Sequence, residues 1–408
     1  MIYLGKEKLI YLAIILLIAG IDGFQCLPLL RELGSRPFYL FILPLILLYA
    51  FKKKCVHVNS YRLLFIAGLY FTSFIGFLLF GFNLIDFSSK NPSFQFLAQG
   101  FLFLVGMSSL VFSTKFFIKV EAFNYVIRLT LLLNLALISL DLLALQFNLI
   151  RPFEKIFYPE GSIVRNMPLG LFSEPSYLGA CFAILTPIYL YNKKIIQVVI
   201  FSILLCAFFY FHQTRTFFVV FIPSMMYMLK IRYKSTVIIG LFLFLSIFTF
   251  YILSDDLGLF AVNENLSSAY RLGNTISYFE YSLNNTVFLG YGFGSSHFLF
   301  PTLDFIFGFL TSDEFITMLS GESENRALVF NLWVRLFIEI GILGSLMLLI
   351  LIFRKFYQCK SDVVRMFFVP TFITSLSSDS FIYGFFWISL FLLFNFEVLD
   401  ESVKNGIS

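Results

Sequence analysis

The chain of 408 residues is 59% hydrophobic and only 13% charged, with a formal net charge of +5. Because charged residues make up about a quarter of an ordinary soluble domain, this composition excludes a soluble fold, a disordered chain and a coiled coil. A mean hydropathy of +0.88 and repeated apolar runs of about 15 to 25 residues predict an all-α polytopic membrane protein, with residues 1–408 forming a single domain.

Apolar runs predict about 12 transmembrane helices. In chain order they lie near residues 9–30, 37–51, 61–82, 94–113, 122–146, 176–191, 195–211, 216–229, 236–253, 328–353, 363–376 and 379–396. The first run follows Lys6 and Lys8 like a signal peptide, but the many runs behind it indicate a retained first span. The second, eighth and eleventh runs are short enough to be tilted, broken or partly re-entrant.

The distribution of lysine and arginine sets the predicted orientation. Nineteen of the 29 fall in the set of loops that includes both termini. Since cytoplasmic loops carry the positive excess, both termini are predicted to be cytoplasmic, and the long segments 147–175 and 254–327 to lie outside. The larger loop is acidic and rich in aromatic residues, and we expect short amphipathic helices in it. A nucleic-acid partner is excluded, because no basic patch with interleaved aromatics lies outside the membrane.

Three arginines occur beside these outer loops. Arg165 precedes Gly-Leu-Phe-Ser-Glu-Pro-Ser at 170–176, Arg215 opens the eighth run, and Arg271 lies in the larger loop. An arginine at an outer span edge opposes the topogenic bias, and its guanidinium can bind a phosphate through two hydrogen bonds. Each alone is equally well explained as an interfacial side chain or a salt-bridge partner. Together they favour an anion-binding role.

Two further features of the outer side have competing interpretations. Glu174, directly before Pro175, either caps a helix N-terminus or accepts a proton from a sugar hydroxyl as a partly desolvated carboxylate. The sequence Gly-Tyr-Gly-Phe-Gly at 290–294 lacks the preceding strand and the later acid of a dinucleotide-binding loop, so we predict a tight turn with close backbone approach. His297 is assigned to the surface or to a turn.

Asp22, Asp141 and Glu339 lie within or at the ends of apolar runs, where ionisable side chains mark relays or substrate paths. An ion-coupled transporter would use such residues to bind or relay the coupling ion. They are few and scattered, and a span-edge position would put each within reach of water, so transport ranks second. The five cysteines form no CxxC and the three histidines lie far apart, so neither a metal ion nor another cofactor is predicted.

Several of these segments, in this order, resemble the bacterial O-antigen polymerases (Wzy) and O-antigen ligases. The segments are Arg165 with 170–176, the sequence His-Gln-Thr-Arg-Thr at 212–216, Tyr270-Arg271, Leu289–Gly294, Asn331, and Glu339–Gly344. They extend over roughly the C-terminal half to two thirds of the chain. The ligases carry a His-Asn pair ahead of the Glu-x-Gly sequence, whereas this chain has Phe330-Asn331. The resemblance therefore favours the polymerase branch.

That branch implies a C-type glycosyltransferase-like fold with its reaction at the periplasmic face of the bacterial inner membrane. The substrate would be an undecaprenyl diphosphate-linked oligosaccharide, whose glycan is transferred onto a new lipid-linked repeat unit without nucleotide sugar or metal. Membrane lipid and a polysaccharide chain-length regulator are the other candidate partners.

On this interpretation the arginines neutralise the diphosphate leaving group, and Glu174 activates the acceptor hydroxyl, with Glu324 as its substitute. Catalytic roles are thus assigned to Glu174, Arg215 and Arg271, and contacts with the diphosphate or glycan to Arg165, Glu324, Arg326 and Asn331. The alternatives are an O-antigen ligase, a lipid-linked oligosaccharide flippase or other transporter, and a non-catalytic assembly subunit. A flippase is expected to show internal pseudo-repeats and charges in a central cavity, and neither is evident in the sequence.

Overall fold

A computed structural model of the chain describes a little over half of its residues. They are 60–80, 92–111, 116–147, 149, 168–170, 172, 175–211, 214–233, 275, 278–280, 283, 288–297, 331–377 and 384–399. The predicted spans near 9–30, 37–51 and 236–253, and most of both outer loops, lie outside these residues.

The described part is almost entirely helical. Its helices are α4 (Ser60–Phe80), α5 (Pro92–Val111), α6 (Val120–Gln146), α8 (Pro175–Leu190), α9 (Ile195–Phe211), α10 (Arg215–Tyr233), the 3-10 turn η3 (Ser295–His297), α14 (Leu332–Gln358), α15 (Asp362–Ser377) and α16 (Gly384–Asn395). Each α-helix overlaps one of the predicted apolar runs. The eighth run, expected to be short, extends to 19 residues as α10, because its polar ends at Arg215 and Lys230 are helical too.

Three helical segments are long and apolar enough to cross a membrane: Ser60–Leu79, Ala122–Gln146 and Leu332–Gln358. At a rise of about 1.5 Å per residue, the first two, with 20 and 25 residues, match or exceed a hydrocarbon core of about 30 Å. The third has 27 residues and contains a kink at Gly341. Shorter apolar stretches occur in α5, α8, α9, α10 and α16. The protein is a membrane protein on this basis, and the count of about 12 crossings stays a prediction.

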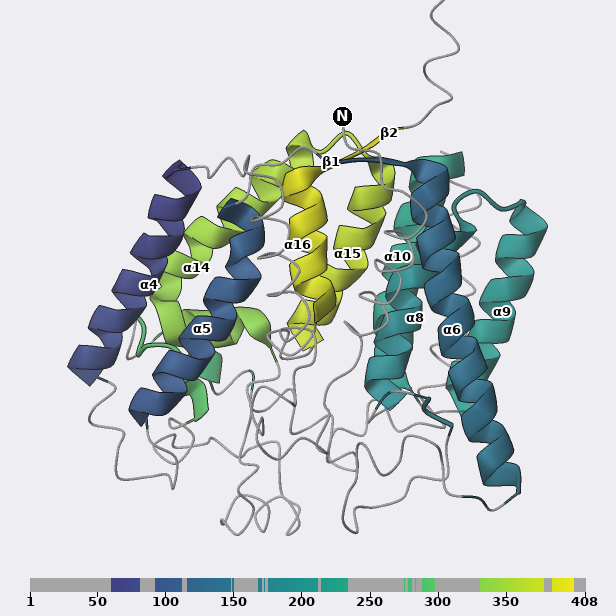
Figure 1. Cartoon of the computed structure of the whole chain (residues 1–408), viewed down its shortest axis with the longest axis horizontal. Helices are drawn as coiled ribbons and strands as arrows, with labels where there is room; N and C mark the ends of the chain where they lie inside the picture. The colour runs from purple at the N-terminus through teal and green to yellow at the C-terminus, as the bar shows by residue number, and fades with distance from the viewer. Residues whose placement is uncertain are drawn as a thin grey trace, which may run out of the picture.

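The helices run between the same two ends of the bundle, with α4 and α5 tilted in the opposite sense to α6 (Figure 1). One group, α4, α5 and α14, occupies the left of the view, and α6, α8 and α9 occupy the right. Between them, α15 contacts α8, α10, α14 and α16, and so connects the two groups. The flanking helices expose large apolar side chains such as Leu64 and Phe71 on α4 and Ile196 and Ile203 on α9, as expected of surfaces in contact with lipid.

Aromatic packing accounts for much of the interior. Phe209 of α9 stacks on Phe217 of α10 with ring centroids 4.1 Å apart, and Phe217 stacks on Phe221 at 4.6 Å. Trp387 of α16 is fully buried against Gly106 of α5, where a Cβ atom would lie 2.5 Å from the indole Cε2. The abundant phenylalanine therefore serves both as interhelical filler and as lipid-facing surface.

One short pair of strands departs from the predicted all-α structure. Strand β1 (Phe116–Lys119) pairs in parallel with β2 (Phe396–Leu399), so that Phe116 stands opposite Phe396 and Lys119 opposite Leu399. β1 leads into α6 and β2 continues from α16, so the pairing joins helices from two parts of the bundle. Their aromatic and β-branched residues favour extended structure, and four residues are too few to give a recognisable apolar alternation.

The two ends of the bundle differ in charge. Among the described residues, every lysine and arginine except Arg215 and Arg335 lies at or near the helix ends on the side of β1 and β2 (Figure 1). On that side the guanidinium of Arg62 lies 5.1 Å from the ring centre of Phe394, and Arg365 donates to the carbonyl of Tyr357 at 3.4 Å. We call this side the basic end. The opposite, cation-poor end holds the starts of α8, α10 and α14.

Candidate functional site

A glycine loop, Phe288–His297, lies against α4 and α14 at the cation-poor end. Its amides of Tyr291 and Gly292 donate to the carbonyls of Ile338 and Glu339 at 2.7 and 3.1 Å. Within an unbroken helix those carbonyls would accept from the next turn. They are released here because Gly341 has φ 76° and ψ 167°, which kinks α14. The kink and the loop therefore complete each other's backbone hydrogen bonds.

The glycines make this contact possible. Gly290 and Gly292 have φ of 75° and 97°, values that residues other than glycine rarely adopt. A Cβ atom at Gly290 would lie 2.5 Å from the backbone nitrogen of Gly341 and 2.8 Å from the carbonyl oxygen of Glu339. Neither backbone atom can move away without breaking the hydrogen bonds between the glycine loop and α14. The predicted tight turn with close backbone approach is confirmed.

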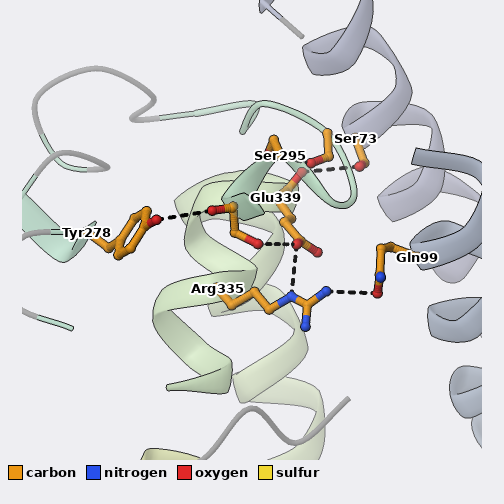
Figure 2. A network of polar contacts seen from close by, with 8 residues as sticks. Ser73, Gln99, Tyr278, Ser295, Arg335 and Glu339 are labelled. Carbon is orange, nitrogen blue, oxygen red and sulfur yellow. Dashed lines mark hydrogen bonds and ion pairs between the residues drawn. The ribbon is translucent and has the colours of Figure 1, made fainter. Parts of the chain in front are cut away.

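Beneath the loop, polar side chains from α4, α5, α14, the glycine loop and residue 278 form one network of hydrogen bonds around Glu339 (Figure 2). Glu339 Oε1 lies 2.9 Å from Arg335 Nε and accepts from the hydroxyl of Ser296 at 2.9 Å. A second nitrogen of the guanidinium, Nη2, donates to Gln99 on α5 at 2.9 Å. Ser73 of α4 donates to the carbonyl of Glu339 at 3.1 Å, and Tyr278 donates to the carbonyl of Ser296 at 3.2 Å. We call Ser73, Gln99, Tyr278, Ser296, Arg335 and Glu339 the Glu339 network.

The network is shielded from solvent, because Arg335 and Glu339 are 1% and 0% exposed. A buried charge is tolerated only when it is paired and hydrogen-bonded, and here Arg335 and Glu339 pair through Nε and Oε1 across one helical turn. The expectation that Glu339 lies within reach of water is therefore wrong. Its chemical role in the structure is to hold the glycine loop, α4, α5 and α14 together.

The same correction applies to Asp141 on α6, which is 2% exposed. Its Oδ2 accepts from the amides of Leu169 and Gly170 at 2.8 and 3.0 Å. Burial arises because these amides belong to a turn, in the segment before α8, that folds back over the helix. Asp22, the third of these ionisable residues, lies outside the described part of the chain.

Asn331, a predicted substrate contact, forms the N-cap of α14. Its Oδ1 accepts from the amides of Trp333 and Val334 at 2.9 and 3.2 Å, which are among the donors that a helix start leaves unsatisfied. Its Nδ2 donates to the carbonyl of Leu376 near the end of α15 at 2.9 Å. Both polar atoms of the side chain are thus engaged within the bundle.

Of the remaining predicted site residues, only Arg215 falls on a described position, and there only the backbone is described. It is the first residue of α10, so it lies at the cation-poor end with the starts of α8 and α14 (Figure 1). Arg165, Glu174, Arg271, Glu324 and Arg326 lie outside the described residues, as does the side chain of His297. Their roles stay predictions.

Sequence reasoning missed the partners of Glu339. The charge distribution between loops places Arg335 with the ten lysines and arginines of the predicted outer side, yet it is almost fully buried and bonded to Gln99, which is far away in the sequence. One signal was available: Arg335 and Glu339 are opposite charges four residues apart in an otherwise apolar run, a spacing at which helical side chains meet.

The chain matches no known protein family, no curated protein and no solved structure.

Proposed function

We propose that the protein is a glycosyltransferase of the O-antigen polymerase type. It transfers a glycan chain from undecaprenyl diphosphate onto a new lipid-linked repeat unit at the periplasmic face of the bacterial inner membrane. The cation-poor end of the bundle is the reaction side, and the basic end faces the cytoplasm, where positive residues accumulate.

One observation carries this proposal. Two of the segments on which the family resemblance rests, Leu289–Gly294 and Glu339–Gly344, are joined in space by backbone hydrogen bonds and by a kink at Gly341. A chance similarity of sequence would give no reason for these segments to require each other's geometry. They also lie at the same end of the bundle as the start of α10 and hence Arg215, a third of those segments.

The charge distribution supports the assignment of Arg215. A diphosphate leaving group develops about two negative charges, and a guanidinium at the lipid-water boundary can stabilise them through paired hydrogen bonds. Arg335, the other described cation of this end, is buried and committed to Glu339 and Gln99. It therefore belongs to the scaffold, and the proposed diphosphate-binding groups are Arg215, Arg165 and Arg271, with Arg326 as a further contact.

The direct test is a purified-protein assay with a defined undecaprenyl diphosphate-linked repeat unit. If the protein is a polymerase, the assay should give a ladder of longer lipid-linked glycans without nucleotide sugar, ATP or an ion gradient. Transfer of the glycan to lipid A core would identify a ligase instead. Movement of the unextended substrate across a proteoliposome membrane would identify a transporter, and either result would overturn the proposal.

Orientation has its own test, for which Phe211 and Tyr357 are matched positions. They are 77% and 76% exposed and end α9 and α14 at the cation-poor and the basic end, respectively. In a background without native cysteines, Phe211→Cys should react with a membrane-impermeant thiol reagent from the periplasmic side and Tyr357→Cys should not. The reverse pattern would place the proposed reaction side in the cytoplasm and contradict the account.

A further inference from the structure

The turn 168–172 is held against α6 by a single buried side chain. Asp141 Oδ2 accepts two hydrogen bonds, from Leu169 N at 2.8 Å and Gly170 N at 3.0 Å. The turn closes on itself through Phe172 N, which donates to the carbonyl of Leu169 at 3.2 Å. Leu169 and Phe172 are both buried at 2% exposure, so the turn is packed as well as bonded.

The backbone of the turn is shaped to reach this carboxyl group. Gly170 has φ 61°, in the left-handed region, which lets two successive amides point to the same side. A Cβ atom at Gly170 would find its nearest neighbours at 3.4 Å, at Ile138 N and Leu137 Cβ, which is ordinary van der Waals contact. Glycine is therefore needed at this position because of the positive φ, and not because a side chain would lack space.

Position in the chain gives the contact its functional meaning. The turn stands between Arg165 and Glu174, two of the residues assigned to the proposed transferase site, and Pro175 begins α8 directly after Glu174. α8 packs against α6, so the described residues on either side of Glu174 in the chain, Phe172 in the turn and Pro175 in α8, both belong to segments held on α6. The carboxyl group of Asp141 is the polar link between that turn and α6.

We propose that Asp141 is a positioning residue for the transferase site, which sets the place of Glu174 by fixing the turn 168–172 on α6. The inference rests on the proposed function. Asp141 acts through the turn in this proposal: its side chain is buried and its Oδ2 accepts the two amides, whereas its Oδ1 has no hydrogen-bond partner in the described part of the chain. Loss of this contact would keep the substrate-binding arginines but change the position of Glu174, the proposed acceptor-activating group. Displacement of such a group by about 1 Å can lower the rate on the order of 100-fold.

The test compares four variants of the full-length protein. Asp141→Leu removes both hydrogen bonds, whereas Asp141→Asn keeps an oxygen that can accept them. Gly170→Ala strains the same turn from its other side without altering α6. Asn134→Leu is the matched control, because Asn134 is buried one heptad earlier on α6 and bonds to Thr130 and Cys181, away from the turn.

Two readouts are needed, and the first is hydrogen-deuterium exchange of the peptide that contains the turn. Asp141→Leu and Gly170→Ala should exchange faster there, Asp141→Asn should lie close to wild type, and Asn134→Leu should match it. This readout does not depend on the nature of the reaction. Unchanged exchange in both Asp141→Leu and Gly170→Ala would overturn the anchoring role.

The second readout is chain extension of a defined lipid diphosphate-linked repeat unit. For Asp141→Leu and Gly170→Ala, kcat should fall by roughly 10- to 100-fold with little change in KM, and Asp141→Asn should restore most of it. Faster exchange together with normal kcat in an active enzyme would overturn the positioning role. Lack of extension by wild type, with the exchange pattern as expected, would instead reject the proposed reaction and with it the functional part of this inference.

Discussion

Glu339 and Asp141 are two buried carboxyl groups at the same end of the bundle, and the structure satisfies them in different ways. Glu339 is paired with Arg335 and bonded to a serine of the glycine loop, whereas Asp141 accepts two backbone amides of the turn before α8. In both cases a carboxyl on a long helix holds a connecting segment against the bundle. Ionisable residues within membrane helices can therefore serve as attachment points for loops as well as relays.

The two attachments differ in how many segments they join. The Glu339 network includes side chains from α4, α5, α14, the glycine loop and residue 278. The Asp141 contact joins only α6 to one turn. Because members of a buried network depend on one another, we expect loss of one member near Glu339 to cost more than loss of the whole contact at Asp141.

The largest effect is expected for Arg335→Ala, which leaves the carboxylate of Glu339 buried without its cation. Removing one partner of a buried ion pair costs about 3–5 kcal/mol of unfolding free energy, measured by denaturant unfolding in detergent. The double variant Arg335→Met with Glu339→Gln should recover part of this loss, since it removes both charges together. A double variant that is less stable than Arg335→Ala would show that the pair is not the unit that matters.

A similar loss is expected for Gly290→Ala. The added methyl group would meet the backbone of Glu339 and Gly341, and the residue would need a positive φ; together these cost about 2–4 kcal/mol. Gly68→Ala is the matched control, because a Cβ there has nothing within 4 Å and alanine is the better helix former. Equal stability of the two variants would mean that the glycine loop does not need its close contact with α14.

Asp141→Leu should cost less, about 1–3 kcal/mol, because it strands two amides without adding a buried charge. The comparison with Arg335→Ala in one detergent tests the proposed ranking directly. If Asp141→Leu destabilised the protein more than Arg335→Ala, the turn 168–172 would be the more important of the two attachments.

The smallest effect is expected at Asn331. Asn331→Ala removes an N-cap and should cost about 0.5–2 kcal/mol, whereas Asn331→Asp keeps the cap oxygen and loses only the bond to Leu376 O. The aspartate variant should therefore be the more stable of the two in thermal unfolding. If it nonetheless abolished chain extension, Asn331 would have the predicted role in substrate binding in addition to capping.

Local patterns in the sequence were enough for the helices and the glycine loop. Apolar runs located α8, α9 and α10 within a few residues, and the spacing of Gly290, Gly292 and Gly294 indicated a turn with close backbone approach. Contacts between distant segments were not accessible in this way. Nothing near Arg335 specifies Gln99 as its partner, and nothing near β1 specifies β2, because these pairings depend on how the helices assemble.

The burial of Asp141 and Glu339 shows the same limit at a finer scale. Each was correctly singled out as an ionisable group in an apolar run, but its distance from water depends on which loop folds over it. For Glu339 that loop is Phe288–His297, and for Asp141 it is the turn at Leu169 and Gly170. A carboxyl within a span is thus recognisable from sequence, whereas its partner is not.

We propose that the cation-poor end of the bundle carries out glycan transfer from a lipid diphosphate. Arg215→Ala at that end and Arg128→Ala, an exposed arginine of α6 near the basic end, form a matched pair for chain extension by purified protein. The account predicts that Arg215→Ala yields no polymer, that Arg215→Lys recovers only part because it keeps the charge and loses the paired hydrogen bonds, and that Arg128→Ala extends like wild type. A normal ladder from Arg215→Ala, or its loss in Arg128→Ala with the protein still folded, would contradict it.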